Sequence, residues 1–131
     1  MSKYAIPYLT ALVVLLVLDM LWLRVIAYDW YRQGMGDHMA EQPNLVAAAL
    51  FYVLYPVGIV IFGVQLGQTD TGVAHALLMG ALFGFFAYAT YDLTNLAVMK
   101  NWPLSLSLLD LGWGTLVSGV AAAGAKFVSR L

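Results

Sequence analysis

The chain has 131 residues, of which 63% are hydrophobic and 10% charged, with a net charge of −1. Soluble domains carry about 25% charged residues, so this composition excludes a soluble domain and indicates a membrane protein. The lack of cysteine excludes disulfides, iron–sulfur clusters and thiolate metal sites. The near-neutral charge, without any basic stripe, argues against a nucleic-acid partner.

Four apolar runs are long enough to cross a bilayer core of about 30 Å, which takes roughly 20 helical residues. The first run has no cleavage site before Asp19 and is too long for a signal peptide, so we expect it to stay as a transmembrane helix. The sequence therefore predicts an all-α membrane protein, a single four-transmembrane-helix bundle over residues 1–131 with both termini on the same side. The predicted helices are about 4–26, 45–64, 73–98 and 104–125.

The connections differ in length. The first, residues 28–44, begins with Tyr28, Trp30 and Tyr31, and such aromatic residues are typical of a membrane interface. We expect an interfacial segment here, with a short amphipathic helix that ends before Pro43. The other two connections are short turns. Lys and Arg residues are shared three to three between the two sides, so the positive-inside rule assigns no cytoplasmic face.

The third run carries its strongly polar groups on one face. Tyr88, Tyr91, Asp92 and Asn95 stand at i, i+3, i+4 and i+7. An ionisable side chain deep in a bilayer costs at least about 2.5–3.5 kcal/mol. Asp92 therefore needs a partner, a proton or a function, and we expect Asn95 to hydrogen-bond its carboxyl group.

Three carboxyl groups fall in one layer when each residue is placed at about 1.5 Å per position along its helix. Asp19, Asp92 and Asp110 all lie towards the side of the first and third connections. Three neighbouring acids cannot all be ionised without a counter-charge, so at least one should hold a proton or a cation should be bound. A second interpretation is open for Asp19 and Asp110, which Arg24 and Lys100 could reach as interfacial ion pairs.

Aromatic residues accompany this layer, and small residues such as Gly80 and Gly84 gather towards the other side. This predicts a cup that opens near the acids, with walls of Trp and Tyr and a floor of glycine. The predicted ligand- or proton-binding residues are Asp19, Trp22, Tyr52, Tyr55, Tyr88, Tyr91, Asp92, Asn95, Asp110 and Trp113. For Trp22 and Trp113, simple belt or packing roles are favoured. No catalytic residue is assigned, and His38 and His75 have no second histidine at i+3 or i+4 that would indicate a metal site.

Several stretches resemble a known family. They are Leu-Asp-Met-Leu-Trp at 18–22, Pro-Asn-Leu at 43–45, Phe-Tyr-Val-Leu-Tyr at 51–55, Ala-Thr-Tyr-Asp-Leu-Thr-Asn-Leu-Ala at 89–97, Asn-Trp-Pro-Leu at 101–104 and Asp-Leu-Gly-Trp-Gly at 110–114. With them the chain resembles, nearly end to end, the uncharacterised bacterial inner-membrane proteins of domain of unknown function family 2177. The resemblance implies a four-helix inner-membrane protein and no particular activity or cofactor.

Three functions remain open. An acid-lined aromatic cup favours binding or carrying a small cationic or amphipathic molecule, or protons. Four helices are too few to give access to both sides, so a carrier would be a homo-oligomer, most simply a dimer. The alternatives are an enzyme or accessory subunit of membrane-lipid modification, and a structural subunit of a membrane complex.

Overall fold

The computed structural model describes residues 2–26, 28–36, 44–68 and 70–131. Within this part of the chain the fold is all-helical, with no strand, which confirms the predicted fold class. The elements are α1 (Ser2–Leu21) with its π-helical continuation η1 (Trp22–Ile26), α2 (Tyr28–Met35), α3 (Leu45–Gly58) with its π-helical continuation η3 (Ile59–Val64), α4 (Val73–Val98) and α5 (Leu104–Ser129).

Four of these helical stretches are long and apolar enough to cross a membrane, at Lys3–Val25, Leu45–Val64, Val73–Val98 and Leu104–Ser129. The predicted boundaries agree closely, except that α5 continues to Ser129. Helices form here because a chain in hydrocarbon must satisfy its backbone hydrogen bonds internally. A short helix is present in the predicted segment, as α2. Residues 37–43, with His38 and Pro43, lie outside the described residues.

Two connections have clear local causes. The Asn44 side chain accepts a hydrogen bond from the backbone N–H of Ala47 at 3.1 Å and so caps the start of α3. In the turn between α4 and α5, Asn101 adopts the left-handed conformation at φ 62°, which asparagine tolerates better than most residues. Pro103 follows as the N-cap of α5, in an extended conformation. The turn is therefore tight, and α4 and α5 run antiparallel.

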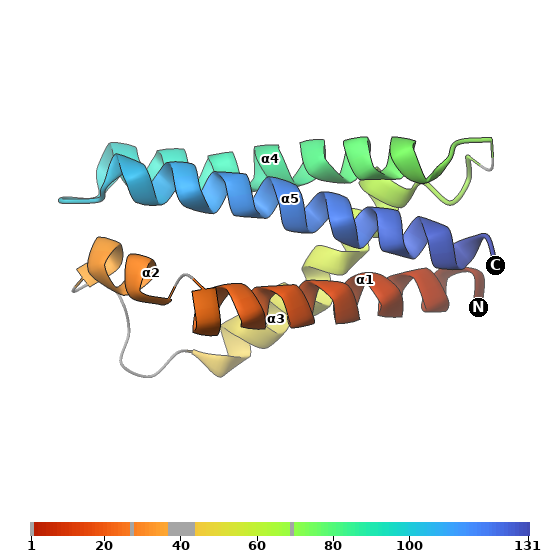
Figure 1. Cartoon of the computed structure of the whole chain (residues 1–131), viewed down its shortest axis with the longest axis horizontal. Coiled ribbons are helices and arrows are strands. Elements are labelled where there is room, and N and C mark those ends of the chain that lie inside the picture. Colours follow the sequence, from red (N-terminus) through yellow and green to blue (C-terminus); the bar gives the residue numbers. More distant parts are fainter. Residues whose placement is uncertain (1, 27, 37–43, 69) are drawn as a thin grey trace.

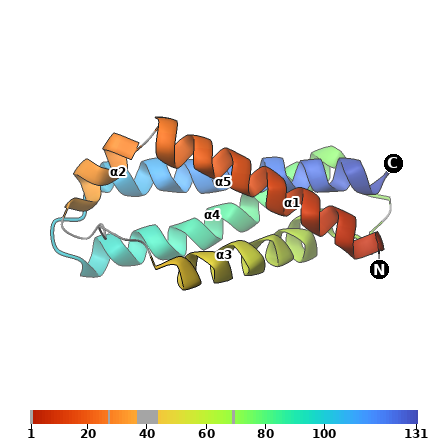
Figure 2. The ribbon, with the colours of Figure 1, turned by 90° about the horizontal axis from the view of Figure 1, so that it is seen from below.

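The helices form a bundle in which α4 and α5 lie side by side along their whole length (Figure 1). Helix α1 packs along α5, and α2 continues beside the first turns of α5 (Figure 2). Both ends of the chain lie at the same end of the bundle (Figure 1). We call this the terminal end, and the opposite one, with α2 and the α4–α5 turn, the α2 end.

Glycines allow α4 and α5 to approach closely. A Cβ atom on Gly84 would lie 2.5 Å from Oγ of Ser118 and closer still to the carbonyl oxygen of Gly114. One on Gly80 would lie 2.7 Å from the carbonyl oxygen of Ser118. The small-residue face predicted on the third helix is thus occupied inside the protomer. These glycines therefore give no support to the predicted dimer.

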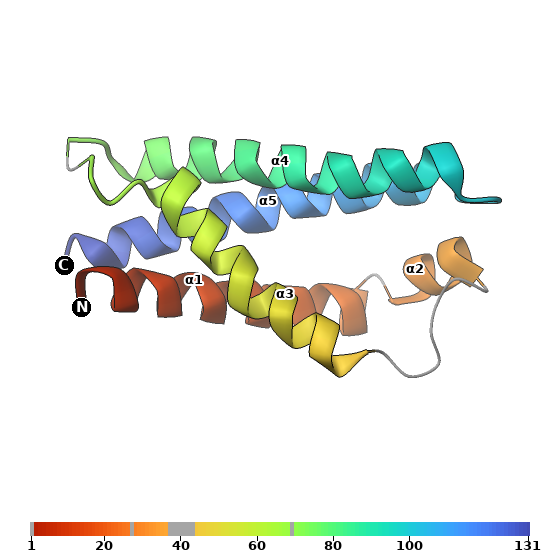
Figure 3. The ribbon, with the colours of Figure 1, turned by 180° about the vertical axis from the view of Figure 1, so that it is seen from behind.

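Helix α3 crosses the bundle obliquely and separates from α4 towards the α2 end (Figure 3). Among the described residues, no Cα atom of α3 lies within 8 Å of a Cα atom of α4. Aromatic side chains span the space instead: Tyr55 stacks on Phe83 at 5.2 Å between ring centroids and meets Tyr88 edge-on at 6.1 Å. Bulky rings therefore hold the two helices apart near the predicted site.

Candidate functional site

The carboxyl group of Asp19 is fully hydrogen-bonded. It is 4% exposed near the end of α1. One oxygen accepts a hydrogen bond from Oη of Tyr52 at 2.8 Å, and the other accepts one from Nε1 of Trp113 at 2.7 Å. Because these donors come from α3 and α5, Asp19 ties three spans together.

A second chain of hydrogen bonds ends on Asp110. Nε1 of Trp22 donates to Oη of Tyr31 at 3.1 Å, and Tyr31 donates to Oδ1 of Asp110 at 2.5 Å. The indoles of Trp22 and Trp113 stack with centroids 4.5 Å apart and planes 3° from parallel. This stack joins the hydrogen bonds that end on Asp110 to those around Asp19. We name the six side chains the polar network: Asp19, Trp22, Tyr31, Tyr52, Asp110 and Trp113.

Tyr31 belongs to α2, outside the membrane spans, and is a member that the sequence-based site did not include. Burial raises the pKa of its phenol above the ordinary value, and the negative charge of Asp110 raises it further. Tyr31 therefore stays protonated and remains a hydrogen-bond donor to Asp110. From the sequence, Tyr31 was only one of the aromatic residues in the predicted interfacial segment. Nothing in the sequence relates it to Asp110, which lies 79 positions away.

Asp92 differs from the other two acids. It is 1% exposed, and neither of its carboxyl oxygens has a hydrogen-bond donor among the described residues. The acid that acts on it most strongly is Asp110, which is close enough for the two carboxyl groups to interact. Two carboxyl groups can hydrogen-bond each other only through a proton held by one of them, and like charges at this range repel strongly when both are ionised. Two ionised carboxyl groups here would therefore need a proton or a counter-charge between them.

The structure thus brings the three predicted acids into one region, in two groups. Asp92 and Asp110 form the close pair, and Asp19 is near enough for its charge to interact with that of Asp110. In the described residues, no group of three His, Cys, Asp or Glu side chains is close enough to hold a metal ion. The acids are therefore neighbours without forming one chelating cluster.

A hollow of about 380 Å³ opens beside Asp110, between α3 and α4. Its lining includes Phe51, Tyr55, Ala87, Tyr88, Tyr91 and Asp110. We name it the aromatic hollow. The ring of Tyr88 rests directly on Gly114, where a Cβ atom would overlap it. Phe51 and Ala87 line the hollow although they were not among the predicted site residues.

Other predicted residues lie elsewhere. Asn95 interacts with Tyr91, one turn earlier on α4, and the expectation that it hydrogen-bonds Asp92 is wrong. The reason is direction: Asp92 points into the bundle, whereas Tyr91 is 51% exposed and Asn95 is half-buried beside it. Trp22, Trp113 and Tyr52 belong to the polar network rather than to the lining of the aromatic hollow.

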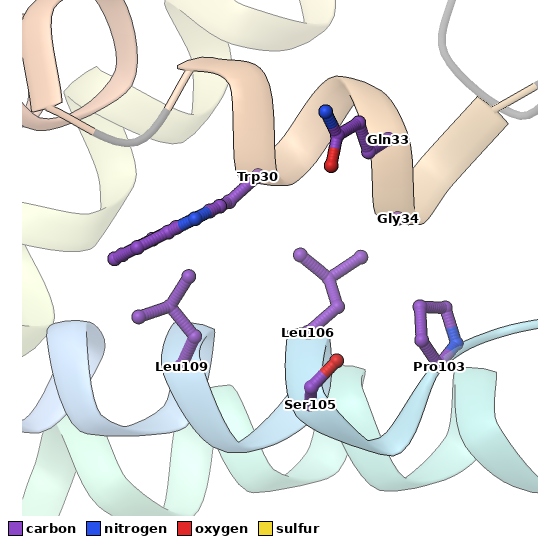
Figure 4. A pocket seen from close by; sticks show the side chains of 7 residues that line it. All are labelled: Trp30, Gln33, Gly34, Pro103, Ser105, Leu106 and Leu109. Atoms are coloured by element: carbon purple, nitrogen blue, oxygen red, sulfur yellow. The ribbon is translucent and has the colours of Figure 1, made fainter.

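A second hollow, of about 440 Å³, lies at the α2 end between α2 and the start of α5 (Figure 4). Trp30 and Gln33 face Leu106 and Leu109 across it (Figure 4). Its lining contains no acid and none of the predicted site residues. The hollow lies beside the contact between α2 and α5, and its residues suggest no chemistry.

Four helices long and apolar enough to cross a membrane, packed around buried polar side chains, define a predicted membrane protein. The family model of the predicted membrane proteins of domain of unknown function 2177 matches residues 4–127. The chain belongs to this family. No curated protein and no solved structure shows detectable similarity to it.

Proposed function

We propose that the aromatic hollow binds a small amphipathic cation and that binding releases a proton from the Asp92–Asp110 pair. Phe51, Tyr55, Tyr88 and Tyr91 present aromatic rings around the carboxyl group of Asp110. Aromatic faces attract organic cations, by about 2 kcal/mol or more when desolvated. A carboxylate among such rings adds the full opposite charge. The hollow, at about 380 Å³, is also within the size range of small-molecule sites.

The observation that carries this proposal is the state of Asp92. A buried polar atom without a donor costs about 1–3 kcal/mol, and more when it is charged. Asp19 receives a donor on each of its two carboxyl oxygens. Asp92 receives none, and we infer that it rests as the neutral partner of Asp110. A cation in the hollow would replace the shared proton as the counter-charge.

The divergence of α3 and α4 supports entry from the lipid side. The hollow lies between these helices, and Tyr91 at its rim is half-exposed. An amphipathic cation that partitions into the bilayer would reach Asp110 without crossing the packed α4–α5 interface. Release to the other side would require a second protomer, so a carrier role includes a homo-oligomer in the bacterial inner membrane.

Binding of tetraphenylphosphonium, an amphipathic aromatic cation, tests the proposal. Binding to the purified protein in lipid nanodiscs is measured by calorimetry from about pH 5 to about pH 9. We expect affinity to rise with pH, because loss of the shared proton adds a second negative charge beside the bound cation. Asp92→Asn should flatten this pH dependence, and Asp110→Asn should weaken binding about tenfold or more.

The matched control is Asp70→Asn, which removes an exposed carboxylate from the α3–α4 connection at the terminal end. It should leave both affinity and pH dependence unchanged. Equal binding by wild type and Asp110→Asn, or pH dependence that survives in Asp92→Asn, would contradict the proposal.

A structural role is the second candidate, and the complete bonding of Asp19 supports it. Under that role all three acids hold the bundle together. Asp19→Leu and Asp92→Leu should then reduce stability equally, with no cation binding by the wild type. Under the first proposal, Asp92→Leu should reduce stability less than Asp19→Leu. The reason is that only Asp19→Leu leaves two buried donors, those of Tyr52 and Trp113, without their acceptor.

A further inference from the structure

A basic pocket lies at the terminal end of the bundle, far along the helices from the acid pair. It has a volume of about 590 Å³. Three cations line it, Lys3 from α1 and Lys126 and Arg130 from the end of α5, together with apolar side chains that include Pro7, Leu66 and Val128. None of the described residues in its lining is acidic.

Lys126 is the unusual member. It is 3% exposed, which is rare for an ammonium group that has no acidic partner among the described residues. Its Nζ donates to the carbonyl oxygens of Val64 at 3.4 Å and Gln68 at 3.0 Å, and to Oγ1 of Thr71 at 3.3 Å. All three acceptors are neutral. The bundle therefore satisfies the hydrogen bonds of Lys126 without neutralising its charge.

Burying a charge is costly, and an opposite charge nearby lowers that cost. Lys126 lines the basic pocket, where Lys3 and Arg130 add two exposed cations. Such a space attracts an anion, and a phosphate group accepts hydrogen bonds from both Lys and Arg. The apolar part of the lining suits the glycerol and the first methylenes of an acyl chain.

We propose that the basic pocket binds the headgroup of an anionic phospholipid at the terminal end. The position favours a lipid over a soluble phosphate, because the pocket sits at the end of three membrane spans, α1, η3 and α5, where headgroups lie. Basic pockets between transmembrane helices are a known form of headgroup site. The occupant is thus a component of the bilayer, distinct from the cation proposed for the aromatic hollow.

Native mass spectrometry of the detergent-purified protein tests this, with phosphatidylglycerol and phosphatidylcholine titrated separately. We expect the wild type to retain one phosphatidylglycerol far more tightly than phosphatidylcholine. The double variant Lys3→Gln, Arg130→Gln removes the two exposed charges and leaves the buried Lys126 in place. It should weaken phosphatidylglycerol binding on the order of 30-fold.

The matched control, Arg24→Gln with Lys100→Gln, removes two exposed cations at the α2 end and should change binding less than about twofold. Equal retention of the two lipids would overturn the proposal, as would equal losses in the two double variants. A third arm adds glycerol 3-phosphate as a soluble competitor. We expect glycerol 3-phosphate to displace phosphatidylglycerol only at high excess. If the protein bound glycerol 3-phosphate but neither lipid, the assignment to a lipid headgroup would be overturned.

Discussion

The close approach of α4 and α5 makes one substitution especially informative. Gly84→Ala adds a methyl group where Oγ and Cβ of Ser118 would be 2.5 and 2.6 Å away and the carbonyl oxygen of Gly114 nearer still. Normal carbon contacts begin at about 3.5 Å. The neighbouring atoms include backbone of α5, which cannot rotate away. The two helices must therefore separate by about 1 Å.

The cost follows from that separation. A gap of about 1 Å loses up to about half of each dispersion contact of about 0.1–0.2 kcal/mol, and about 20 atom pairs across the interface would then lose about 1.5 kcal/mol. Strain at the overpacked site adds about 1–3 kcal/mol. Replacing glycine by alanine in a helix returns about 1 kcal/mol. We expect Gly84→Ala to be destabilised by about 2 kcal/mol overall.

Gly112→Ala is the matched control on α5, because a Cβ atom there would meet nothing within 4 Å. This variant should be as stable as the wild type or more stable by up to about 1 kcal/mol. Equilibrium unfolding in mixed micelles of increasing SDS content, followed by tryptophan fluorescence, measures both variants. Equal stability of Gly84→Ala and Gly112→Ala would refute the packing described for α4 and α5.

Two further predictions concern polar side chains outside the aromatic hollow. Tyr31→Phe removes the donor to Asp110 and should cost about 2 kcal/mol in the same unfolding assay. Because the pKa of Tyr31 is raised on folding, its contribution is complete below about pH 10 and is lost above it, so wild-type stability should fall there. Tyr31→Phe should lessen that slope by about 1.4 kcal/mol per pH unit, and an unchanged slope would contradict the buried position. Lys126→Met removes the donor to Gln68 and Thr71, so hydrogen exchange in the peptide containing them should accelerate, with no change at the α2 end.

The four spans could be predicted from the sequence for two reasons. The thickness of the bilayer sets the length of an apolar span, and a backbone in hydrocarbon must make its hydrogen bonds internally, which favours a helix. The depth of the acids followed from the same regularity, since 1.5 Å per residue places Asp19, Asp92 and Asp110 at one level once the spans are known. A short helix at the position of α2 was predicted from a cluster of aromatic residues, a composition typical of a membrane interface.

The details of the site required side-chain directions, which periodicity does not provide. Tyr31 reaches Asp110, and Trp113 reaches Asp19 across 94 positions, through the tertiary packing of different helices. Asn95 shares a predicted helix face with Asp92. That face spans about a quarter of a turn, so residues at its two edges point in different directions. Of these two residues, Asp92 points into the bundle and Asn95 does not. The π-helical segments η1 and η3 at the ends of the first two spans also carry no pattern that would distinguish them from α-helix.

The central claim is that Asp92 and Asp110 share a proton that a bound cation displaces. Infrared difference spectroscopy of the protein in lipid, with and without tetraphenylphosphonium, tests it most directly, because a protonated carboxyl group has its own C=O stretching band. We predict a protonated-carboxyl band at neutral pH that shifts in deuterated water, is altered in Asp92→Asn and disappears when the cation binds. A spectrum without that band, or a band that the cation leaves unchanged, would contradict the account.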